Sequence, residues 1–577
     1  MNQPTKECIK WRSELLDGLS PQDVGYLTAR LDELDRAKGY VESNSWLRGA
    51  IKNVELISRL SVTGMRETVL KEAERRQKRE GQAVAYAWVR SVVDRLFFCD
   101  EWITDLTGDK LANWANEKSR RFEMSSKGLQ ARKGLTVFDY VKKEAEAVNA
   151  NFNQWDDAEK VEALMLRMCT PEWWARQAKR HYRAVENIRR ECGQVCNQQS
   201  PYVSRWGINR YRKQRQANRA FLESWEAINQ HEQSFLLSEL ADKSISNPIH
   251  NKAELSVRIR GLQYLAVQSG HEARFITITC PSKYHPVHKD TGFRNRKFYA
   301  FGCPSPREAQ QYLNKQWAKI RAAYDREGIK FYGIRTVEPH HDGTPHWHLI
   351  LFVAKNQSAR LLEIAEEYAL EVDGHEQGAD KSRFDEILLD PEKGGAVAYV
   401  AKYIAKNIDG KDANGKPLEI LDEETGRTFV DSAERVQAWK ARHGIRQFQF
   451  LGASSVTVWR EIRRLKDSIP KAFSEIYTAA VANDWKRFSE LMGSGKGQAL
   501  RPFYEQGENN QFGEPTMKIK GLWNVFAEYV PTRLFEWTIQ RVGAGALSLG
   551  AAEPFPRNRV NNCTGGVAPP YQVPIYQ

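Results

Sequence analysis

The middle of the chain constrains the fold most, because strand patterns appear there in an otherwise largely helical sequence. The segment "RFITITC" (274–280) alternates and is rich in β-branched residues, and "KFYGIRTVE" (330–338) and "HWHLILFVA" (346–354) have the composition of strands. The segment "PHHDGTP", which joins the last two, is typical of a hairpin turn. A helix is predicted before this hairpin, where Ser305 and Glu308 can form a capping box. A strand, a helix and a hairpin, followed by further helices, predict an α+β fold with a mostly antiparallel sheet.

The chain has 577 residues, which is too many for a single core, so we expect several domains. Residues 1–245 have apolar residues at helical spacing and little strand signal, which predicts a large helical N-terminal region. The α+β domain, a sheet flanked by helices, is predicted at 250–465, after the break "SISNPIHN". A smaller helical C-terminal region is expected at 466–542. Residues 543–577 are rich in proline, glycine and asparagine and are expected to be disordered.

The charge of the chain suits a polyanionic partner, because the net charge is +13 and the pI is about 9.2. Most of the excess lies in residues 172–221, which hold 12 lysines and arginines against 3 acids, together with six tryptophans and tyrosines. Cations and aromatic rings together suit single-stranded DNA, whose phosphates attract cations and whose bases stack on rings. The alternative is a pair of charged helices with aromatic residues in the core, and the sequence leaves both interpretations open.

The eight cysteines are scattered, and the spacing of Cys192 and Cys196 differs from that of zinc knuckles. We therefore expect reduced cysteines in a protein of the cytoplasm. The N-terminus "MNQPTKECIK" is polar, which is unlike a signal peptide. Apolar runs stay well below the length of about 18 residues that a membrane span needs, so no membrane partner is expected.

A metal site is predicted at the hairpin. His346 and His348 are two residues apart on a strand, so both imidazoles project from one face. Glu338, on the neighbouring strand, is the candidate third ligand if the turn is loose enough to pair it with His346 or His348. A tight turn would point Glu338 to the other face, and His340 or Asp342 would then have to replace it.

Two histidines and a carboxylate with open positions suit Mg²⁺ or Mn²⁺ as a Lewis acid on a phosphate oxygen, although these ligands also admit Zn²⁺. The prolines at both ends of the turn, Pro339 and Pro345, cannot donate ladder hydrogen bonds, which favours the loose turn. The sequence therefore predicts a divalent metal ion on one face of the sheet.

The segment "AVAYVAKYIAKNID" (396–409) is predicted to be an amphipathic helix with two tyrosines on its polar face. At about 100° per residue, Tyr399, Lys402, Tyr403 and Lys406 fall within one arc. Val397, Val400, Ala401, Ile404 and Ala405 lie on the opposite, apolar side. The simple interpretation is a pair of half-buried surface tyrosines. The functional interpretation is a pair of nucleophiles, with Lys402 and Lys406 supplying positive charge to bind DNA.

A tyrosine that attacks a DNA phosphodiester beside a metal ion leaves a 5′-phosphotyrosine and a free 3′-OH. This linkage keeps the energy of the broken bond, so a second tyrosine one helical turn away could attack in its turn and pass the strand on. The metal hairpin therefore gives both tyrosines a function that the helix alone does not suggest.

The ordered motifs "FITITC", "EPHHDGTPHWHLILF" and "YVAKYIAK" resemble those of HUH endonucleases, which have a threonine-rich strand, a His-hydrophobic-His motif and a tyrosine helix. More narrowly, "TCPSKYHP", "YGIRTVEPHHDGTPHWH" and "FLGASSVTVWREIRR" resemble the bacteriophage replication gene A protein family, which are two-tyrosine rolling-circle initiators. The resemblance is specific over about 250–465 and extends weakly over much of the helical N-terminal part. It implies an HUH endonuclease domain in which Tyr399 and Tyr403 are nucleophiles and His346 and His348 are metal ligands, and Glu338 matches less closely.

The resemblance also implies the biological setting. The family nicks origin DNA, either single-stranded or supercoiled duplex, and forms a covalent tyrosyl–DNA link. A host polymerase then extends the 3′-OH, and the strand is later rejoined. We therefore expect origin DNA, a host helicase and a host polymerase as partners in the bacterial host cytoplasm, and no small-molecule cofactor beyond the metal.

Two other functions stay open. A two-tyrosine HUH transposase has the same order of motifs, whereas in relaxases the tyrosine precedes the histidines. A non-enzymatic basic DNA-binding protein would explain the charge and the aromatic residues, but not the two tyrosines and two lysines on one helical face. The segment "MGSGKGQ" (492–498) is not a phosphate-binding loop, because Glu490 stands where GxxxxGK[ST] needs its first glycine and Gly497 follows Lys496. Unwinding is therefore expected to come from the host helicase.

Overall fold

The computed structural model describes residues 4–57, 65–96, 103, 106–129, 136–148, 150, 152–289, 291–412, 414–465, 469–493, 498–510, 512 and 514–543. Contacts divide the chain into two compact units, Met1–Cys192 and Gly193–Gln577. The expected disordered tail and most of "MGSGKGQ" lie outside the described residues. Residues 193–245 belong by their contacts to the second unit, which also contains the sheet expected at 250–465.

The regular secondary structure of the first unit is helical in its described residues, as predicted. Its helices are α1 (Lys6–Leu16), α2 (Pro21–Lys38), α3 (Tyr40–Ile57), α4 (Met65–Glu80), α5 (Gln82–Leu96), α6 (Gly108–Leu129), α7 (Val137–Ala147), α8 (Ala158–Met168) and α9 (Pro171–Glu191). Helix α2 illustrates why they form: the Ser20 side chain accepts a hydrogen bond from the Asp23 amide, and Pro21 occupies the first turn. Leu27, Leu31 and Leu34 of this helix recur at helical spacing and are buried.

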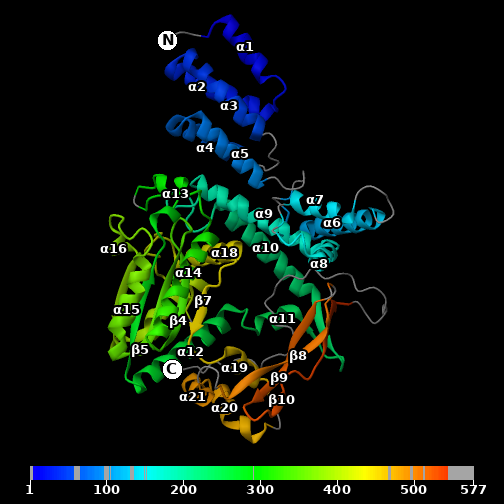
Figure 1. Cartoon of the computed structure of the whole chain (residues 1–577). Coiled ribbons are helices and arrows are strands. Elements are labelled where there is room, and N and C mark those ends of the chain that lie inside the picture. Colours follow the sequence, from blue (N-terminus) through cyan, green and yellow to red (C-terminus); the bar gives the residue numbers. More distant parts are fainter. Residues whose placement is uncertain are drawn as a thin grey trace. The chain divides into compact units, whose positions relative to one another are not determined.

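The second unit is built on a five-stranded antiparallel sheet with the strand order β6-β3-β5-β4-β7 (Figure 1). The strands are β3 (His271–Ile278), β4 (Phe331–Pro339), β5 (Pro345–Ala354), β6 (Phe384–Leu389) and β7 (Phe448–Leu451). The α+β class and the three central strands are therefore confirmed. Strand β6 was not predicted, because a six-residue edge strand with four exposed residues lacks a clear alternation.

Helices cover both faces of this sheet. They include α12 (Pro248–Gln268), α14 (Pro306–Arg326), α15 (Lys355–Leu370) and α17 (Gly395–Ile408). On one face, Ile276, Leu349 and Leu351 pack in a cluster with residues of α14 and α15. On the other face, Phe275 and Ile350 pack in a cluster with residues of α12 and α17. Successive strand residues point to opposite faces, so residues along each strand of the hairpin alternate between the α14–α15 side and the α12–α17 side of the sheet.

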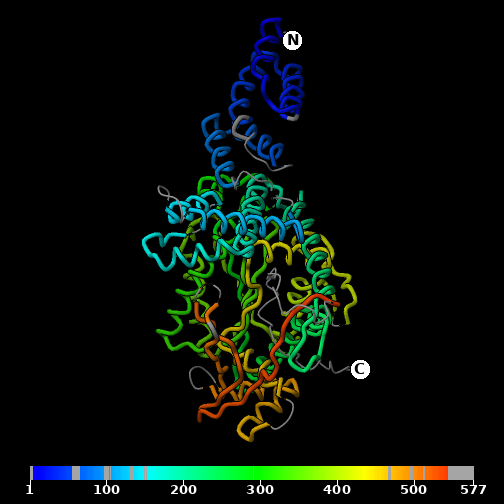
Figure 2. Tube along the Cα trace, turned by 90° about the vertical axis from the view of Figure 1, so that its right-hand side faces the viewer, coloured from blue at the N-terminus to red at the C-terminus, as the bar shows by residue number. Residues whose placement is uncertain are grey.

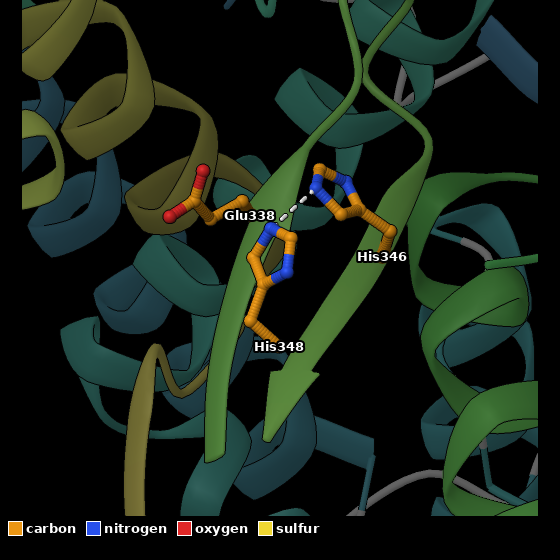
Figure 3. A group of neighbouring side chains, drawn as sticks. All are labelled: Glu338, His346 and His348. Carbon is orange, nitrogen blue, oxygen red and sulfur yellow. Dashed lines mark hydrogen bonds between the residues drawn. The ribbon is translucent and has the colours of Figure 1, made fainter. Parts of the chain in front are cut away.

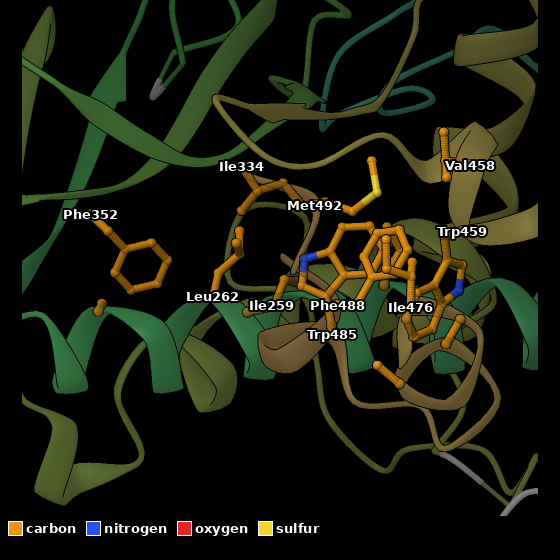
Figure 4. Packing of buried hydrophobic residues seen from close by; sticks show 14 of the residues in the cluster. Ile259, Leu262, Ile334, Phe352, Val458, Trp459, Ile476, Trp485, Phe488 and Met492 are labelled. Atoms are coloured by element: carbon orange, nitrogen blue, oxygen red, sulfur yellow. The ribbon is translucent and has the colours of Figure 1, made fainter. Parts of the chain in front are cut away.

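The cluster on the α12 and α17 face continues into a tryptophan-rich core (Figure 4). Trp459 and Trp485 lie with their ring centroids 4.9 Å apart, and Phe488 packs against both. These residues come from α19 (Val456–Ile462) and α21 (Trp485–Met492), which α20 (Lys471–Val481) connects. The remaining described helices of this unit are α10 (Arg205–Ser224), α11 (Leu237–Asp242), η1 (Ser282–Tyr284), α13 (Arg296–Ala300), α16 (Ala379–Ser382), η2 (Pro391–Lys393) and α18 (Phe429–His443).

The hairpin between β4 and β5 has the loose turn. Glu338 pairs with His346, and Pro339 pairs with Pro345. The turn is closed by two backbone hydrogen bonds, from the His340 amide to the Thr344 carbonyl and from the Gly343 amide to the His340 carbonyl. Gly343 has a φ of 80°, a left-handed conformation that suits glycine. Glu338 therefore projects from the same face as His346 and His348.

The prediction of helices throughout residues 466–542 is wrong in its second half. Four strands form there: β8 (Leu500–Asn509), β9 (Pro515–Asn524), β10 (Tyr529–Pro531) and β11 (Trp537–Arg541). Strands β8, β9 and β10 make one antiparallel sheet, whereas β11 pairs with β1 (Trp225–Asn229), which pairs with β2 (Ser234–Leu236). The orange and red tube in Figure 2 follows these C-terminal strands.

The physical reason lies in the local composition. The segment "PTMKIKGLWN" alternates between apolar and polar residues over Met517–Lys520, and "WTIQR" alternates and contains tryptophan and isoleucine, which favour strands. Strand β11 can form only because β1, about 300 residues earlier, offers a free edge, which no local pattern reveals. For the same reason the N-terminal 245 residues are not entirely helical, since β1 and β2 interrupt them at 225–236.

The aromatic residues of the basic segment 172–221 are mainly core residues. Trp173, Trp174, Tyr182 and Tyr202 are buried, and Tyr182 donates a hydrogen bond to the Ile103 carbonyl. A buried ring cannot stack on a base, so the interpretation as charged helices with an aromatic core fits these four residues. DNA binding by this segment stays a prediction, and it now rests on the exposed cations of the segment alone. Within the described residues, none of the helices is long and apolar enough to cross a membrane.

We predict opposite effects for two helical glycines. Gly261 lies where α12 crosses α21, and a Cβ atom there would lie 2.6 Å from the Trp485 Cβ and 2.8 Å from the Lys486 amide nitrogen. Gly261→Ala should therefore lower the free energy of unfolding of the second unit by about 1–3 kcal/mol, as overpacked cores do. Gly25→Ala in α2 is the matched control, because no described atom lies within 4 Å of its Cβ position. It should stabilise the first unit by about 0.5–1 kcal/mol. Urea unfolding followed by circular dichroism measures both, and equal signs would contradict the prediction.

Candidate metal and tyrosine site

The two histidines of β5 meet on the sheet face that α17 covers. The Nε2 atoms of His346 and His348 lie 3.0 Å apart (Figure 3). On the other side of its ring, the Nδ1 atom of His348 lies 3.1 Å from the hydroxyl of Thr277, which pairs with His348 across β3 and β5. This hydroxyl can hold the imidazole orientation that turns Nε2 towards His346, as residues around metal ligands commonly do.

Glu338 completes a group that could hold a metal ion. One carboxylate oxygen of Glu338 and one ring nitrogen each of His346 and His348 lie within 4.8 Å of one another. The Glu338 carboxylate is almost fully buried and accepts a hydrogen bond from the Asn407 side chain. Its other oxygen lies 3.3 Å from the Lys406 Nζ. Of the alternatives left open by the sequence, the loose turn therefore favours Glu338 over His340 or Asp342.

Burial keeps the two histidines neutral. It lowers the pKa of His348 to about 3, with a further contribution from Lys406, and it lowers the pKa of His346 well below its usual value. Burial also raises the pKa of Glu338, against the opposing effect of Lys406. Neutral imidazoles have free lone pairs, so the two histidines are ready to bind a metal ion at neutral pH without first losing a proton.

The donors fit a divalent ion. They combine two neutral nitrogens with one carboxylate that can be ionised, which is a common ligand set for divalent metals. The His346 Nδ1 atom is buried and has no hydrogen-bond partner among the described residues. The carboxylate lies deep in the protein, where an ion would offset the cost of its negative charge.

The tyrosine helix α17 lies against this group. The ring of Tyr403 packs on His348, with centroids 4.7 Å apart. The ring of Tyr399 packs on Phe275 at 4.4 Å, and Phe275 in turn lies 5.2 Å from His348. The two tyrosine rings are 5.9 Å apart and both are half-buried. The structure thus brings Tyr403 directly to the histidines and leaves Tyr399 one ring farther away.

The sequence predicts that Lys402 and Lys406 share one exposed face of α17, and this prediction is wrong. Lys402 is exposed and pairs with Glu423 at 2.6 Å. Lys406 is only 12% exposed and lies between the buried carboxylates of Glu338 and Asp422, at 3.3 and 3.2 Å. Two buried negative charges require a cation, which draws Lys406 inward although the helical period places it beside Lys402. Lys406 is therefore part of the interior of the site and does not face solvent.

Several residues of the site were not found from the sequence. Asp422 holds the far side of Lys406 and accepts a hydrogen bond from the Tyr202 hydroxyl. Tyr202 precedes Asp422 by more than two hundred residues, so no local pattern joins them. Asp422 belongs to the acidic segment "LDEETGR", in which three acids follow one another and nothing local singles out Asp422.

A second pair of histidines borders the group. His340 stacks on His346 at 4.0 Å, and its Nδ1 atom lies 3.3 Å from Glu424. Burial opposes protonation of His340, but Glu424 raises the pKa of His340 above its usual value. His285 Nδ1 lies 2.9 Å from the buried Asp342. The acids of the turn and of the 410–428 loop therefore hold these outer histidines.

The comparison with known families agrees with this geometry. The family described as bacteriophage replication gene A protein (GPA) matches residues 106–411, which is more than half of the chain and includes the hairpin and the tyrosine helix. The chain belongs to this family. The matched residues also include part of the helical first unit, so the family extends beyond the sheet.

Individual relatives of the family are longer than this chain. The replication gene A protein of Escherichia phage 186 is 37% identical over 71% of this chain and 61% of its own length. The replication protein of Haemophilus phage HP1 is 38% identical over 67% of the chain and 50% of its own length. A probable replication endonuclease from a prophage-like region of Salmonella typhi is 33% identical over 69% of the chain and 52% of its own length. The chain thus spans about half to three fifths of these relatives, and no solved structure matches it.

The hydrogen bond between Thr277 and His348 predicts that Thr277 supports metal binding in this member of the gene A protein family. Thr277→Val keeps the shape of the side chain but removes the hydroxyl that orients His348. We expect about 10- to 100-fold weaker binding of Mn²⁺, which is typical for the loss of a residue that supports a ligand. A titration of free Mn²⁺ by electron paramagnetic resonance measures this.

The matched control is Thr279→Val. The Thr279 hydroxyl donates its hydrogen bond to the Ser382 carbonyl and not to a histidine, so its loss should leave Mn²⁺ binding unchanged. Wild-type Mn²⁺ affinity in Thr277→Val would contradict the orienting role of this hydroxyl.

The different environments of the two lysines generate a second prediction. Lys406→Met leaves the carboxylates of Glu338 and Asp422 buried without their cation, so the free energy of unfolding should fall by about 3–5 kcal/mol. Lys402→Met, one turn earlier, breaks only an exposed ion pair with Glu423 and should cost at most about 1 kcal/mol. Urea unfolding of both variants gives the comparison, and equal losses would show that Lys406 does not neutralise the buried acids.

Proposed function

We propose that the chain is a site-specific DNA endonuclease that starts phage rolling-circle replication. One observation carries the proposal: a helix with two tyrosines packs against a two-histidine, one-carboxylate group on the same sheet face. The names of the relatives, which include replication gene A proteins and a probable replication endonuclease, support the same reaction. The substrate would be origin DNA, cut in one strand, in an HUH endonuclease domain at about 250–465.

We propose Mg²⁺ or Mn²⁺ as the metal, held by His346, His348 and Glu338. Two imidazole nitrogens and one carboxylate oxygen leave positions of an octahedral ion open for water and a phosphate oxygen, which supports an ion of this kind. When bound, such an ion withdraws negative charge from the phosphate under attack.

The tyrosines would act as nucleophiles. The phenol oxygen forms a bond to phosphorus while the bond from phosphorus to the 3′ oxygen breaks, which leaves a 5′-phosphotyrosine. The phenol loses its proton and the 3′ oxygen gains one, so the step needs neither an oxidant nor water. Burial raises the pKa of Tyr403 and Tyr399 above the usual value, so these phenols are not ionised in advance.

The second tyrosine would make a second attack, so that the strand can be passed on and rejoined. A free tyrosine can attack a newly made origin while the first remains linked, and the released 3′-OH can attack the old phosphotyrosine to rejoin the strand. Each transfer breaks one phosphoester bond and forms another. Tyr399 and Tyr403 are one helical turn apart, with rings 5.9 Å from each other, so a small movement of the strand could bring a phosphate to either.

Exposed cations of the second unit would hold the DNA backbone. Lys402 is exposed on α17, between the two tyrosines in sequence. Helix α10 carries further exposed cations. Within the basic segment 172–221, this helix has the most exposed lysines and arginines. These residues are Arg205, Arg212, Lys213, Arg215 and Arg219. Such contacts would position the strand and carry no base specificity.

The partners and the setting belong to the same proposal. A host polymerase would extend the 3′-OH, a host helicase would unwind the duplex, and both would meet the protein in the bacterial cytoplasm. A transposase would cut transposon ends and not a phage origin. A purely DNA-binding protein would bind the same DNA but form no covalent link.

The covalent link is the direct test. Supercoiled plasmids carrying fragments of the genome that encodes this chain are incubated with the protein and Mn²⁺. Nicked circles with attached protein are then sought on denaturing gels. We predict that Tyr399→Phe combined with Tyr403→Phe abolishes the adduct, because both phenol oxygens are lost. Mass spectrometry of the digested adduct should find DNA on one of these two tyrosines in the wild type.

The matched control is Tyr264→Phe, which changes an exposed tyrosine of α12 and should leave the adduct unchanged. An adduct that persists in the double variant, or that maps to another residue, would refute the assignment. Nicking without any attached protein would refute the tyrosine mechanism as a whole.

A further inference from the structure

The sheet of β8, β9 and β10 has one packed face and one exposed aromatic face. Leu500, Leu522 and Val530 are buried on the packed face, in the same cluster as Val400 and Ile404 of the tyrosine helix. The opposite face carries Trp523 and Tyr529, which are 40% and 45% exposed, and Phe503 beside them. Tyrosine and tryptophan seldom gather on an exposed sheet face without a partner, so this face is a candidate binding surface.

The pairing of the strands places these rings side by side. Trp523 pairs with Tyr529 across β9 and β10, and Phe503 pairs with Gly521 across β8 and β9. The Tyr529 ring lies over Gly521, because a Cβ there would come within 2.7 Å of its Cε2 atom. This glycine lets the Tyr529 ring approach Phe503 to 4.8 Å between centroids. The rings are therefore held in place before any partner arrives, which lowers the entropy lost on binding.

The charges of this face suit a polyanion. The β-bulge at Phe503/Tyr504 adds a residue to β9, so β8 keeps its alternation, and Arg501, Phe503 and Glu505 share this face with Trp523 and Tyr529. Glu505 lies opposite Lys518 and pairs with Lys520 at 3.6 Å. The cations Arg501, Lys518 and Lys520 therefore outnumber the carboxylate of Glu505 among these residues. Glu528 is in the β9–β10 turn, where it bonds the Asn524 side chain.

We propose that this aromatic face binds single-stranded DNA, with bases stacked on Trp523 and Tyr529 and phosphates near Arg501 and Lys518. Stacking on aromatic rings accepts every base, which suits a strand whose sequence changes as replication advances. The face favours DNA over a protein partner because its large exposed apolar groups are aromatic, and because Lys520 pairs with its carboxylate, Glu505, while Arg501 and Lys518 add positive charge. The inference rests on the proposed function, since it assigns the DNA strand of that reaction a second contact.

The shared hydrophobic cluster gives the face its role. The sheet packs through Leu500, Leu522 and Val530 into the same core as α17, and Arg533 beside β10 pairs with Glu461 of α19 at 2.8 Å. The aromatic face is therefore fixed relative to the tyrosines and is not on a mobile appendage. A strand held there would stay attached to the protein while the bond at the tyrosines is broken and rejoined.

The test measures binding of fluorescently labelled oligo(dT) of about 20 nucleotides by anisotropy, in EDTA, so that no cleavage is needed. Trp523→Ala with Tyr529→Ala should weaken binding about 10- to 100-fold. Trp523→Phe with Tyr529→Phe should keep binding close to the wild type. Trp523→Leu with Tyr529→Leu should lose it, because leucine keeps the apolar area without the ring. Tyr264→Ala, which removes an exposed tyrosine elsewhere in the unit, is the matched control and should bind like the wild type.

Unchanged binding in the alanine variant, or wild-type binding in the leucine variant, would overturn the proposal. So would a change of oligomeric state on light scattering with unchanged DNA binding, since the face would then join two copies of the chain. Cross-linking of the wild type to iodouracil-substituted DNA avoids any question of folding, and residues 501–531 should carry the cross-link. Its absence there would also overturn the proposal. Failure of the wild type to form the covalent adduct would refute the endonuclease, whereas this binding is measured without it.

Discussion

The buried Glu338 carboxylate is the constraint on which the site depends. A negative charge at this depth is costly unless a cation approaches it, and Lys406 provides one from α17. Asp422 holds the other side of the same ammonium group, and Tyr202 donates a hydrogen bond to Asp422. This chain of contacts ties the tyrosine helix to the hairpin, so the position of the tyrosines follows from neutralising a candidate metal ligand. A bound divalent ion would share the charge of Glu338 with Lys406.

The sheet face under α17 combines this charge network with aromatic packing. Phe275, His348, Tyr399 and Tyr403 form one continuous set of rings, and Thr277 orients His348 from the neighbouring strand. The same burial that packs the rings keeps the histidines neutral, because it lowers the pKa of both imidazoles. Packing and metal-binding capacity therefore have a single cause here.

The sequence predicted the centre of this arrangement well. Strands β3, β4 and β5 were recognisable because they are rich in β-branched and aromatic residues, as strands buried between helices are. The register of Glu338 opposite His346 was one of the two loose-turn registers that the sequence allowed. The paired tyrosines were visible because a helical period brings residues four apart together. The sequence was less informative at the edges. Strand β6, the C-terminal sheets and the burial of Trp173, Trp174, Tyr182 and Tyr202 all depend on neighbours that local patterns do not name.

The sequence by itself determined the chemistry that the chain can present: two histidines on one strand face, a carboxylate near them, and two tyrosines on one helical turn. These follow from the fixed periods of strands and helices, which act over a few residues. Only the tertiary structure decided that Lys406 points inward to Glu338 and Asp422 while Lys402 stays in solvent. It also decided that one face of the β8–β10 sheet is left aromatic and exposed. The free energies of burying a charge or a ring depend on contacts between residues far apart in the chain, and those contacts exist only after folding.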